Sequence, residues 1–166
     1  MNTAVQTPRG SVRLSTIAIF LTLLISADTT FAALTITETA TPSFGLIFGG
    51  PSGRQFILNT DGTITGADAA DYVSGAVAGE LEVKKTGGKV FPAHIVAENI
   101  STVGGLSVAA VLCKFHNDPQ TNCSGAGISV SLQGKRRLLL GVDMSTTQVH
   151  SGGTSSVSFD ITVTLL

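Results

Sequence analysis

The sequence predicts an antiparallel all-β protein with one domain, a sandwich or a barrel, on three observations. Short runs in which apolar and polar residues alternate recur along the chain. Clusters of glycine, proline and serine separate these runs at the spacing expected of turns between neighbouring strands. Charged residues make up only 13% of the chain, tryptophan is absent, and small and β-branched residues are abundant, a composition that favours sheets over helices.

The last alternating run is the clearest. Val157, Phe159, Ile161, Val163 and Leu165 alternate with serine, aspartate and threonine, so one face of this strand is expected to be buried and the other exposed. The other predicted strands cover residues 34–38, 43–48, 54–58, 80–84, 90–98, 106–115, 127–132 and 137–142.

Two further segments have distinct local patterns. The Asp61-Gly62 pair lies between apolar positions and predicts a hairpin over residues 56–65. A helix fits only residues 67–78, where Gly75 and the following Gly79 limit it to one or two turns.

The N-terminus has the three parts of a secretory signal peptide. Arg9 and Arg13 precede an apolar run over residues 15–27, and Thr30 and Ala32 supply the small residues that a signal peptidase requires. The apolar run is well short of the ~20 residues of a transmembrane helix, so a permanent anchor is the weaker alternative. We therefore expect cleavage after Ala32, with residues 1–32 removed and residues 33–166 forming the β-sandwich domain.

The two cysteines, Cys113 and Cys123, lie in the predicted mature region and bracket a polar loop between two strand-like runs. Because an exported protein meets an oxidising compartment, we expect one disulfide, at the neck of a hairpin formed by these runs. The same loop contains His116 and Asp118, so a zinc or copper site is the alternative; oxidation of both thiols would remove it.

Several short motifs resemble those of the bacterial secreted proteins grouped as domain of unknown function 4402. They are Leu34-Thr-Ile-Thr at the mature start, Ser43-Phe44-Gly45-Leu-Ile47, the Asp61-Gly62-Thr63 hairpin, and the Gly152-Gly153 turn before the final alternating strand. That family is in turn similar to fimbrial subunits, which the C-terminal alternation and Gly153 also resemble. The resemblance implies an immunoglobulin-like sandwich that lacks one strand until a neighbour's N-terminal segment completes it. Leu165 stands where the main pilin family has a penultimate tyrosine.

The other candidate site residues have ordinary structural explanations. His94 lies within a strand-like run and His150 at a turn, and no nucleophile motif accompanies them. The carboxylates Asp61, Asp68, Asp71, Glu80 and Glu82 lack the ligand alternation of a calcium loop. The basic residues Lys84, Lys85, Lys89, Lys135, Arg136 and Arg137 are the alternative site, a patch for an anionic polysaccharide or lipid. We expect no catalytic residues, no metal and no cofactor.

These features favour an exported structural subunit of a fimbria-like appendage or extracellular matrix that assembles by β-strand addition. Leu34 and Ile36 are the candidate donor strand, and Val157, Phe159, Ile161, Val163 and Leu165 the candidate acceptor strand; alternatively, Leu34 and Ile36 belong to an ordinary first strand of their own domain. The expected partners are copies of the chain or another fimbria-like subunit, with a periplasmic chaperone possible. With nearly balanced charge, no nucleic-acid binding is expected, and after cleavage no stable membrane insertion.

The expected location is outside the cell, on the surface or in the periplasm of a Gram-negative-type bacterium. The alternative function is a monomeric periplasmic or cell-surface module that binds a glycan or small ligand, and the third class is a secreted enzyme, which would need a cleft with convergent polar groups.

Overall fold

The computed structural model describes residues 33–47, 50–149 and 155–166. The predicted signal peptide, His150 and the Gly152-Gly153 turn lie outside these residues. Within them the protein is all-β, as predicted, and every pairing between strands is antiparallel. The described part of the chain holds no helix of the length and hydrophobicity that a membrane span requires.

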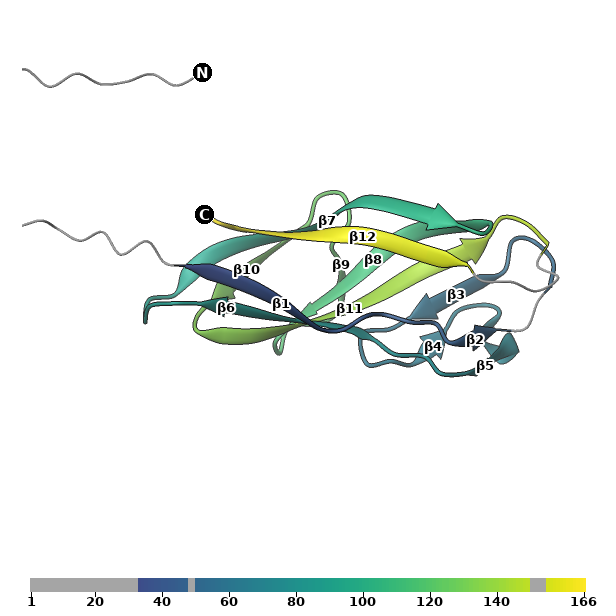
Figure 1. The fold of residues 1–166 in the computed structure, drawn as a ribbon, viewed down its shortest axis with the longest axis horizontal. Coiled ribbons are helices and arrows are strands. Elements are labelled where there is room, and N and C mark those ends of the chain that lie inside the picture. The colour runs from purple at the N-terminus through teal and green to yellow at the C-terminus, as the bar shows by residue number, and fades with distance from the viewer. Residues whose placement is uncertain (1–32, 48–49, 150–154) are drawn as a thin grey trace, which may run out of the picture. The chain divides into compact units, whose positions relative to one another are not determined.

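The strands form two main sheets and a small ribbon (Figure 1). The large sheet has the order β1-β6-β11-β3-β4, and β8 pairs with β11 and with β9. It contains β1 (Leu34–Ala40), β3 (Gln55–Leu58), β4 (Ile64–Thr65), β6 (Gly79–Lys85), β8 (Leu106–Phe115), β9 (Thr121–Asn122) and β11 (Lys135–Thr146). The small sheet has the order β10-β7-β12, with β10 (Ile128–Leu132), β7 (Phe91–Val103) and β12 (Ser156–Leu165). The ribbon pairs β2 (Leu46–Ile47) with β5 (Tyr72–Ser74).

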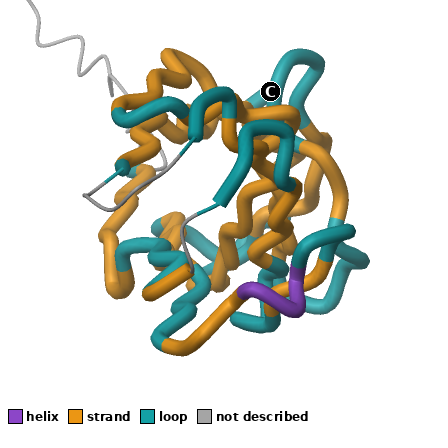
Figure 2. Tube along the Cα trace, turned by 90° about the vertical axis from the view of Figure 1, so that its right-hand side faces the viewer, coloured by secondary structure: helices purple, strands orange, loops and turns teal. Residues whose placement is uncertain are grey.

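The core lies between the two main sheets because alternate side chains of each strand point inward. One cluster of buried residues draws on both sheets: Leu81 and Val83 come from β6, Ile95 from β7, Leu132 from β10 and Leu138 from β11. Figure 2 shows the strands arranged around this interior. The protein is therefore a β-sandwich held together by apolar packing between the sheets.

The predicted helix over residues 67–78 does not form. Its place is taken by one 3-10 turn, Ala69–Asp71, followed directly by β5. Gly66 and Gly75 both have positive φ angles, +114° and +88°, which interrupt a helix at both ends of this segment. The predicted hairpin at Asp61-Gly62 is confirmed, because β3 pairs with β4 across that turn.

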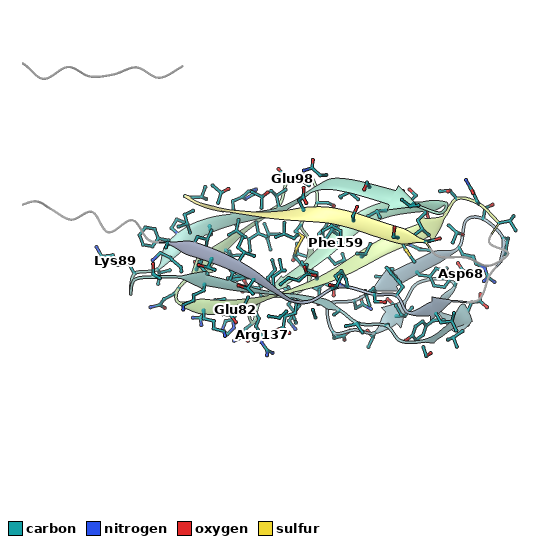
Figure 3. All side chains as sticks on the ribbon, viewed as in Figure 1. Asp68, Glu82, Lys89, Glu98, Arg137 and Phe159 are labelled. Atoms are coloured by element: carbon teal, nitrogen blue, oxygen red, sulfur yellow. A yellow bond between two sulfur atoms is a disulfide. The ribbon has the colours of Figure 1, made fainter. Side chains whose placement is uncertain are left out.

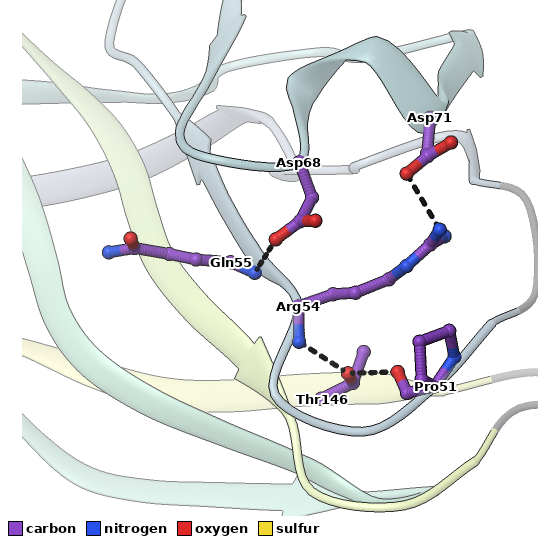
Figure 4. A network of polar contacts seen from close by, with 6 residues as sticks. All are labelled: Pro51, Arg54, Gln55, Asp68, Asp71 and Thr146. Atoms are coloured by element: carbon purple, nitrogen blue, oxygen red, sulfur yellow. Dashed lines mark hydrogen bonds and ion pairs between the residues drawn. The ribbon is translucent and has the colours of Figure 1, made fainter.

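Polar contacts fix the loops at the β3 end of the sandwich (Figure 4). The Arg54 guanidinium lies 2.8 Å from a carboxylate oxygen of Asp71. The Gln55 N–H donates to the Asp68 carboxylate over 2.8 Å, and the Arg54 N–H donates to the Thr146 hydroxyl over 3.1 Å. That hydroxyl donates to the Pro51 carbonyl over 3.2 Å. The two carboxylates are thus used in holding the loop to β3.

Candidate functional site

One side of the sandwich is closed by the segment that follows β9. The Cys123 N–H donates to the Val111 carbonyl of β8 over 2.9 Å, and the Ala97 N–H of β7 donates to the Cys123 carbonyl over 2.8 Å. Cys123 is therefore hydrogen-bonded to a strand of each sheet. The predicted disulfide between Cys113 and Cys123 is confirmed, with the two Cα atoms 5.7 Å apart. Both half-cystines are fully buried, so the link lies inside the core.

The chain after Cys123 crosses from the large sheet to the small one. The Asn122 side-chain oxygen accepts hydrogen bonds from the Ser124 N–H and hydroxyl, over 2.8 and 2.6 Å, which turns the backbone. Gly125 and Gly127 follow with φ angles of +70° and +67°. Consequently the second strand-like run, β10, pairs with β7 and not with β8. The predicted hairpin between the two runs is wrong; only the short β9 pairs with β8.

The opposite side of the sandwich is bordered by two edge strands, β1 and β12. In the part of the chain that the structure describes, β1 pairs with β6 alone and β12 with β7 alone. The strands β1 and β12 belong to different sheets and do not pair with each other. This side of the sandwich is therefore not closed by hydrogen bonds between strands. A row of unpaired backbone N–H and C=O groups on such an edge is a template for another strand.

The apolar residues of β12 line this side. Side chains of β12 alternate between half-buried and exposed along its whole length, and the half-buried ones are Val157, Phe159, Ile161, Val163 and Leu165. They pack against the core clusters, and Figure 3 shows Phe159 on β12 over the interior. The matching inward residues of central strands, such as Val83 and Ile95, are fully buried. The core is therefore covered incompletely along β12.

The composition of the two edges offers little protection against strand addition. β12 carries one charged residue, Asp160, and β1 carries one, Glu38; neither contains lysine or proline. Edges that resist addition are usually short, bulged, or marked by such residues. The pairing of β12 with β7 has one bulge, and it lies in β7, where Asn99 and Ile100 are opposite Phe159 and Asn99 adopts a φ of +51°. The segment from Asp160 to the end of the chain lies beyond it.

The candidate donor residues Leu34 and Ile36 lie in β1 of their own domain. Leu34 is opposite Lys85 and Ile36 opposite Val83, in the antiparallel pairing with β6. Leu34 packs against the same core cluster as Phe159, Ile161, Val163 and Leu165, whereas Ile36 is 39% exposed. The structure thus has the segment as a first strand, the second of the two alternatives from the sequence. Thr41 and Pro42 connect it to the rest of the domain.

The candidate metal-ligating residues from the sequence either lie apart from one another or already form hydrogen bonds or ion pairs within the protein. With Cys113 and Cys123 oxidised, the loop retains His116 and Asp118, and the described residues include no group of three metal-ligating side chains. Asp61 accepts hydrogen bonds from the Thr63 hydroxyl and N–H, over 2.6 and 2.9 Å, and these bonds lower the pKa of its carboxyl below the usual value. It lies in the β3–β4 turn, away from the loop that holds Asp68 and Asp71.

Lys84 and Lys135 lie directly opposite each other on β6 and β11, but other members of the predicted basic patch already have partners. Lys135 is paired with Glu82, and the Arg137 Nε lies 3.2 Å from a Glu80 oxygen. Lys85 is buried, 2% exposed, because it continues the inward alternation of Leu81 and Val83.

Contacts with neighbouring groups offset the free-energy cost of burying the Lys85 ammonium. It donates to the carbonyls of Thr86 and Lys89, each over 3.2 Å, and lies 4.0 Å from the centre of the Phe91 ring. The prediction of one basic patch missed the role of Lys85 in the β6–β7 turn. The alternation of inward and outward residues along β6 indicated that Lys85 points inward. Lys85 holds the β6–β7 turn and belongs to no surface patch.

Comparison of the chain with protein-family models, with curated proteins and with solved structures gave no match.

Proposed function

We propose that the protein is an exported structural subunit of a fimbria-like appendage or extracellular matrix, built on an immunoglobulin-like sandwich and assembled by β-strand addition. The observation that carries the proposal is β12: a ten-residue edge strand whose five apolar side chains are only half-buried. An added strand gains backbone hydrogen bonds along this edge and covers those side chains. Full burial of a large apolar side chain is worth about 1.5 to 3 kcal/mol, so covering part of five of them is a substantial driving force.

The donor in this proposal is β1 of another copy. Within its own domain β1 is paired along one edge only, and most of its side chains are exposed. Moving β1 from its own β6 to a neighbour's β12 exchanges one set of backbone hydrogen bonds for another, which is close to neutral. The net gain then comes from covering the half-buried apolar side chains of the neighbour's β12, which no strand covers within the described residues. Because each copy gives a strand to the next, the assembly grows as an open chain.

Locking β1 to its own β6 tests this proposal. Thr35 and Lys84 are directly opposite in the pairing and both are exposed, so cysteines there can form a cross-strand disulfide. We expect the oxidised Thr35→Cys, Lys84→Cys variant to remain monomeric. After mild reduction, which spares the buried Cys113–Cys123 link, it should polymerise again. Size-exclusion chromatography and electron microscopy of filaments provide the measurement.

The matched control is Thr35→Ser, Lys84→Ser, which alters the same positions without a cross-link and should polymerise like the unmodified protein. Filaments formed by the oxidised cysteine variant would exclude β1 as the donor. A monomeric state of the unmodified protein at every concentration tested, on unheated gels and in the microscope, would overturn the structural function itself.

Export makes a separate prediction. The Ala33 N–H donates to the Thr86 hydroxyl over 2.9 Å and the Thr86 N–H to the Ala33 carbonyl over 3.0 Å, so Ala33 is tied to the β6–β7 turn. Cleavage after Ala32 would therefore leave β1 and its first contacts whole. Mass spectrometry of protein from the culture medium or periplasm should give a chain that begins at Ala33. A chain that retains Met1 in the membrane fraction would contradict export with cleavage.

A further inference from the structure

A cleft of about 490 Å³ lies where the free edge of β10 faces the ends of β8 and β11. Its polar lining comes from three places in the chain: His116 and Asp118 follow β8, Ser129 and Ser131 lie on β10, and Arg136 lies at the start of β11. Pro92 of β7 adds an apolar surface. The cleft is on the side of the sandwich away from β1 and β12, so it is separate from the proposed assembly edge.

Arg136 differs from the two basic residues beside it. Lys135 and Arg137 point to the outer face of the large sheet, where they pair with Glu82 and Glu80. Because side chains alternate along a strand, Arg136 points the other way, into the cleft, and is half-buried. It forms no ion pair among the described residues, where its guanidinium makes a long hydrogen bond, 3.4 Å, to the Lys135 carbonyl. The guanidinium therefore has donors available for an anionic group.

The turn after β8, which lies beside the start of β11, is held in an unusual conformation. His116 has a φ of +52°, a region that residues with a side chain rarely adopt. The His116 N–H donates to the Arg137 carbonyl over 2.8 Å, and the Asp118 N–H donates to the Phe115 carbonyl over 2.9 Å. These bonds fix the turn so that both side chains line the cleft. Strained backbone of this kind is concentrated at functional sites.

We infer that this cleft binds an acidic sugar, a uronic acid unit of a polysaccharide. A planar guanidinium matches a carboxylate with two parallel hydrogen bonds. Asp118 accepts hydrogen bonds from sugar hydroxyls, and Ser129 and Ser131 both donate and accept them. Pro92 provides an apolar surface for the C–H face of a pyranose ring. A simple inorganic anion would pair with Arg136 but leave Asp118 without a donor, and a neutral sugar would leave Arg136 without an anionic partner.

Binding of oligogalacturonate to the purified protein, measured by isothermal titration calorimetry, tests this inference. We expect saturable binding of the oligomer and weaker binding of free galacturonate. Arg136→Gln should lower the affinity for the oligomer at least tenfold. Ser131→Tyr should cause a similar loss, because it fills the cleft without changing the charge. The methyl-esterified oligomer, which has the same chain without carboxylates, should bind at least tenfold more weakly than the acid.

Two matched variants separate the cleft from general charge and surface effects. Arg137→Gln removes the adjacent charge outside the cleft, and Thr164→Tyr adds a tyrosine at an exposed position of the same small sheet. Both should keep the affinity within twofold. Equal losses for Arg137→Gln and Arg136→Gln would indicate bulk electrostatics and overturn the site, as would the absence of saturable binding. The result does not depend on polymerisation, since the oxidised Thr35→Cys, Lys84→Cys monomer should bind equally well.

Discussion

Gly141→Ala is expected to lower the free energy of unfolding by about 3 kcal/mol, at the upper end of the cost of overpacking a core. Gly141 lies buried in β11, and a Cβ atom there would be 2.1 Å from the Leu58 carbonyl oxygen. That oxygen belongs to the backbone of β3, which pairs with β11 at the next residue, Val142. The added methyl group therefore has to push the two paired strands apart. Urea unfolding followed by circular dichroism measures the loss.

Gly88→Ala is the matched control for this variant. Gly88 lies in the β6–β7 turn without a positive φ, and a Cβ atom added there would have no other atom within 4 Å. The same change should therefore stay within about 0.5 kcal/mol of the unmodified protein. If Gly141→Ala proved equally neutral, the close approach of Leu58 to β11 would be wrong.

Replacing both Cys113 and Cys123 by serine is expected to lower the free energy of unfolding by about 3 kcal/mol, the value that the chain-entropy relation gives for a loop of this length. The link closes a short loop, because the cysteines are separated by 10 positions in the sequence. Both positions are fully buried, so serine hydroxyls there would need new hydrogen-bond partners. Thermal or urea unfolding of the two forms gives the difference.

The double Cys→Ala variant separates the cross-link from the polar burial. It also lacks the link but buries no hydroxyl, so it should be destabilised no more than the serine variant. Hydrogen exchange should quicken first at the Cys123 and Ala97 amides, because these N–H groups join the closing segment to both sheets. Native protein with two titratable thiols would contradict the disulfide.

The sequence predicted the strands well where alternation and turns coincide. β8 has the predicted bounds, and β12 begins one residue early. β11 was predicted to begin at Arg137 but begins at Lys135. The side chains of its first three residues alternate between the outer face of the sheet and the cleft, but all three are basic. Alternation of apolar residues cannot reveal a strand whose alternating residues are all basic.

Pairing between strands was harder to predict than the strands themselves. The run over residues 127–132 has the same alternation whether it pairs with β8 or with β7. The outcome depends on the Asn122–Ser124 turn and the glycines after it, which send the chain to the other sheet. Likewise, the sequence placed Arg136 in a basic cluster. Its separation from Lys135 and Arg137 follows from the alternation of side chains along β11, and the predicted strand did not include Lys135 and Arg136. The proximity of the two serines of β10 to His116 depends on the same crossing.

The positions of the first and last strands of the described β domain have a mechanical consequence. Leu34 lies opposite Lys85 and Leu165 opposite Ala93, on either side of the β6–β7 turn, so both ends are at one end of the sandwich (Figure 1). A force that pulls these ends apart would peel β1 and β12 away, breaking their hydrogen bonds one after another at low load. A force along a strand added to β12 would instead load all of its hydrogen bonds in shear at once. In the assembly that we propose, a filament would therefore resist tension through its added strands.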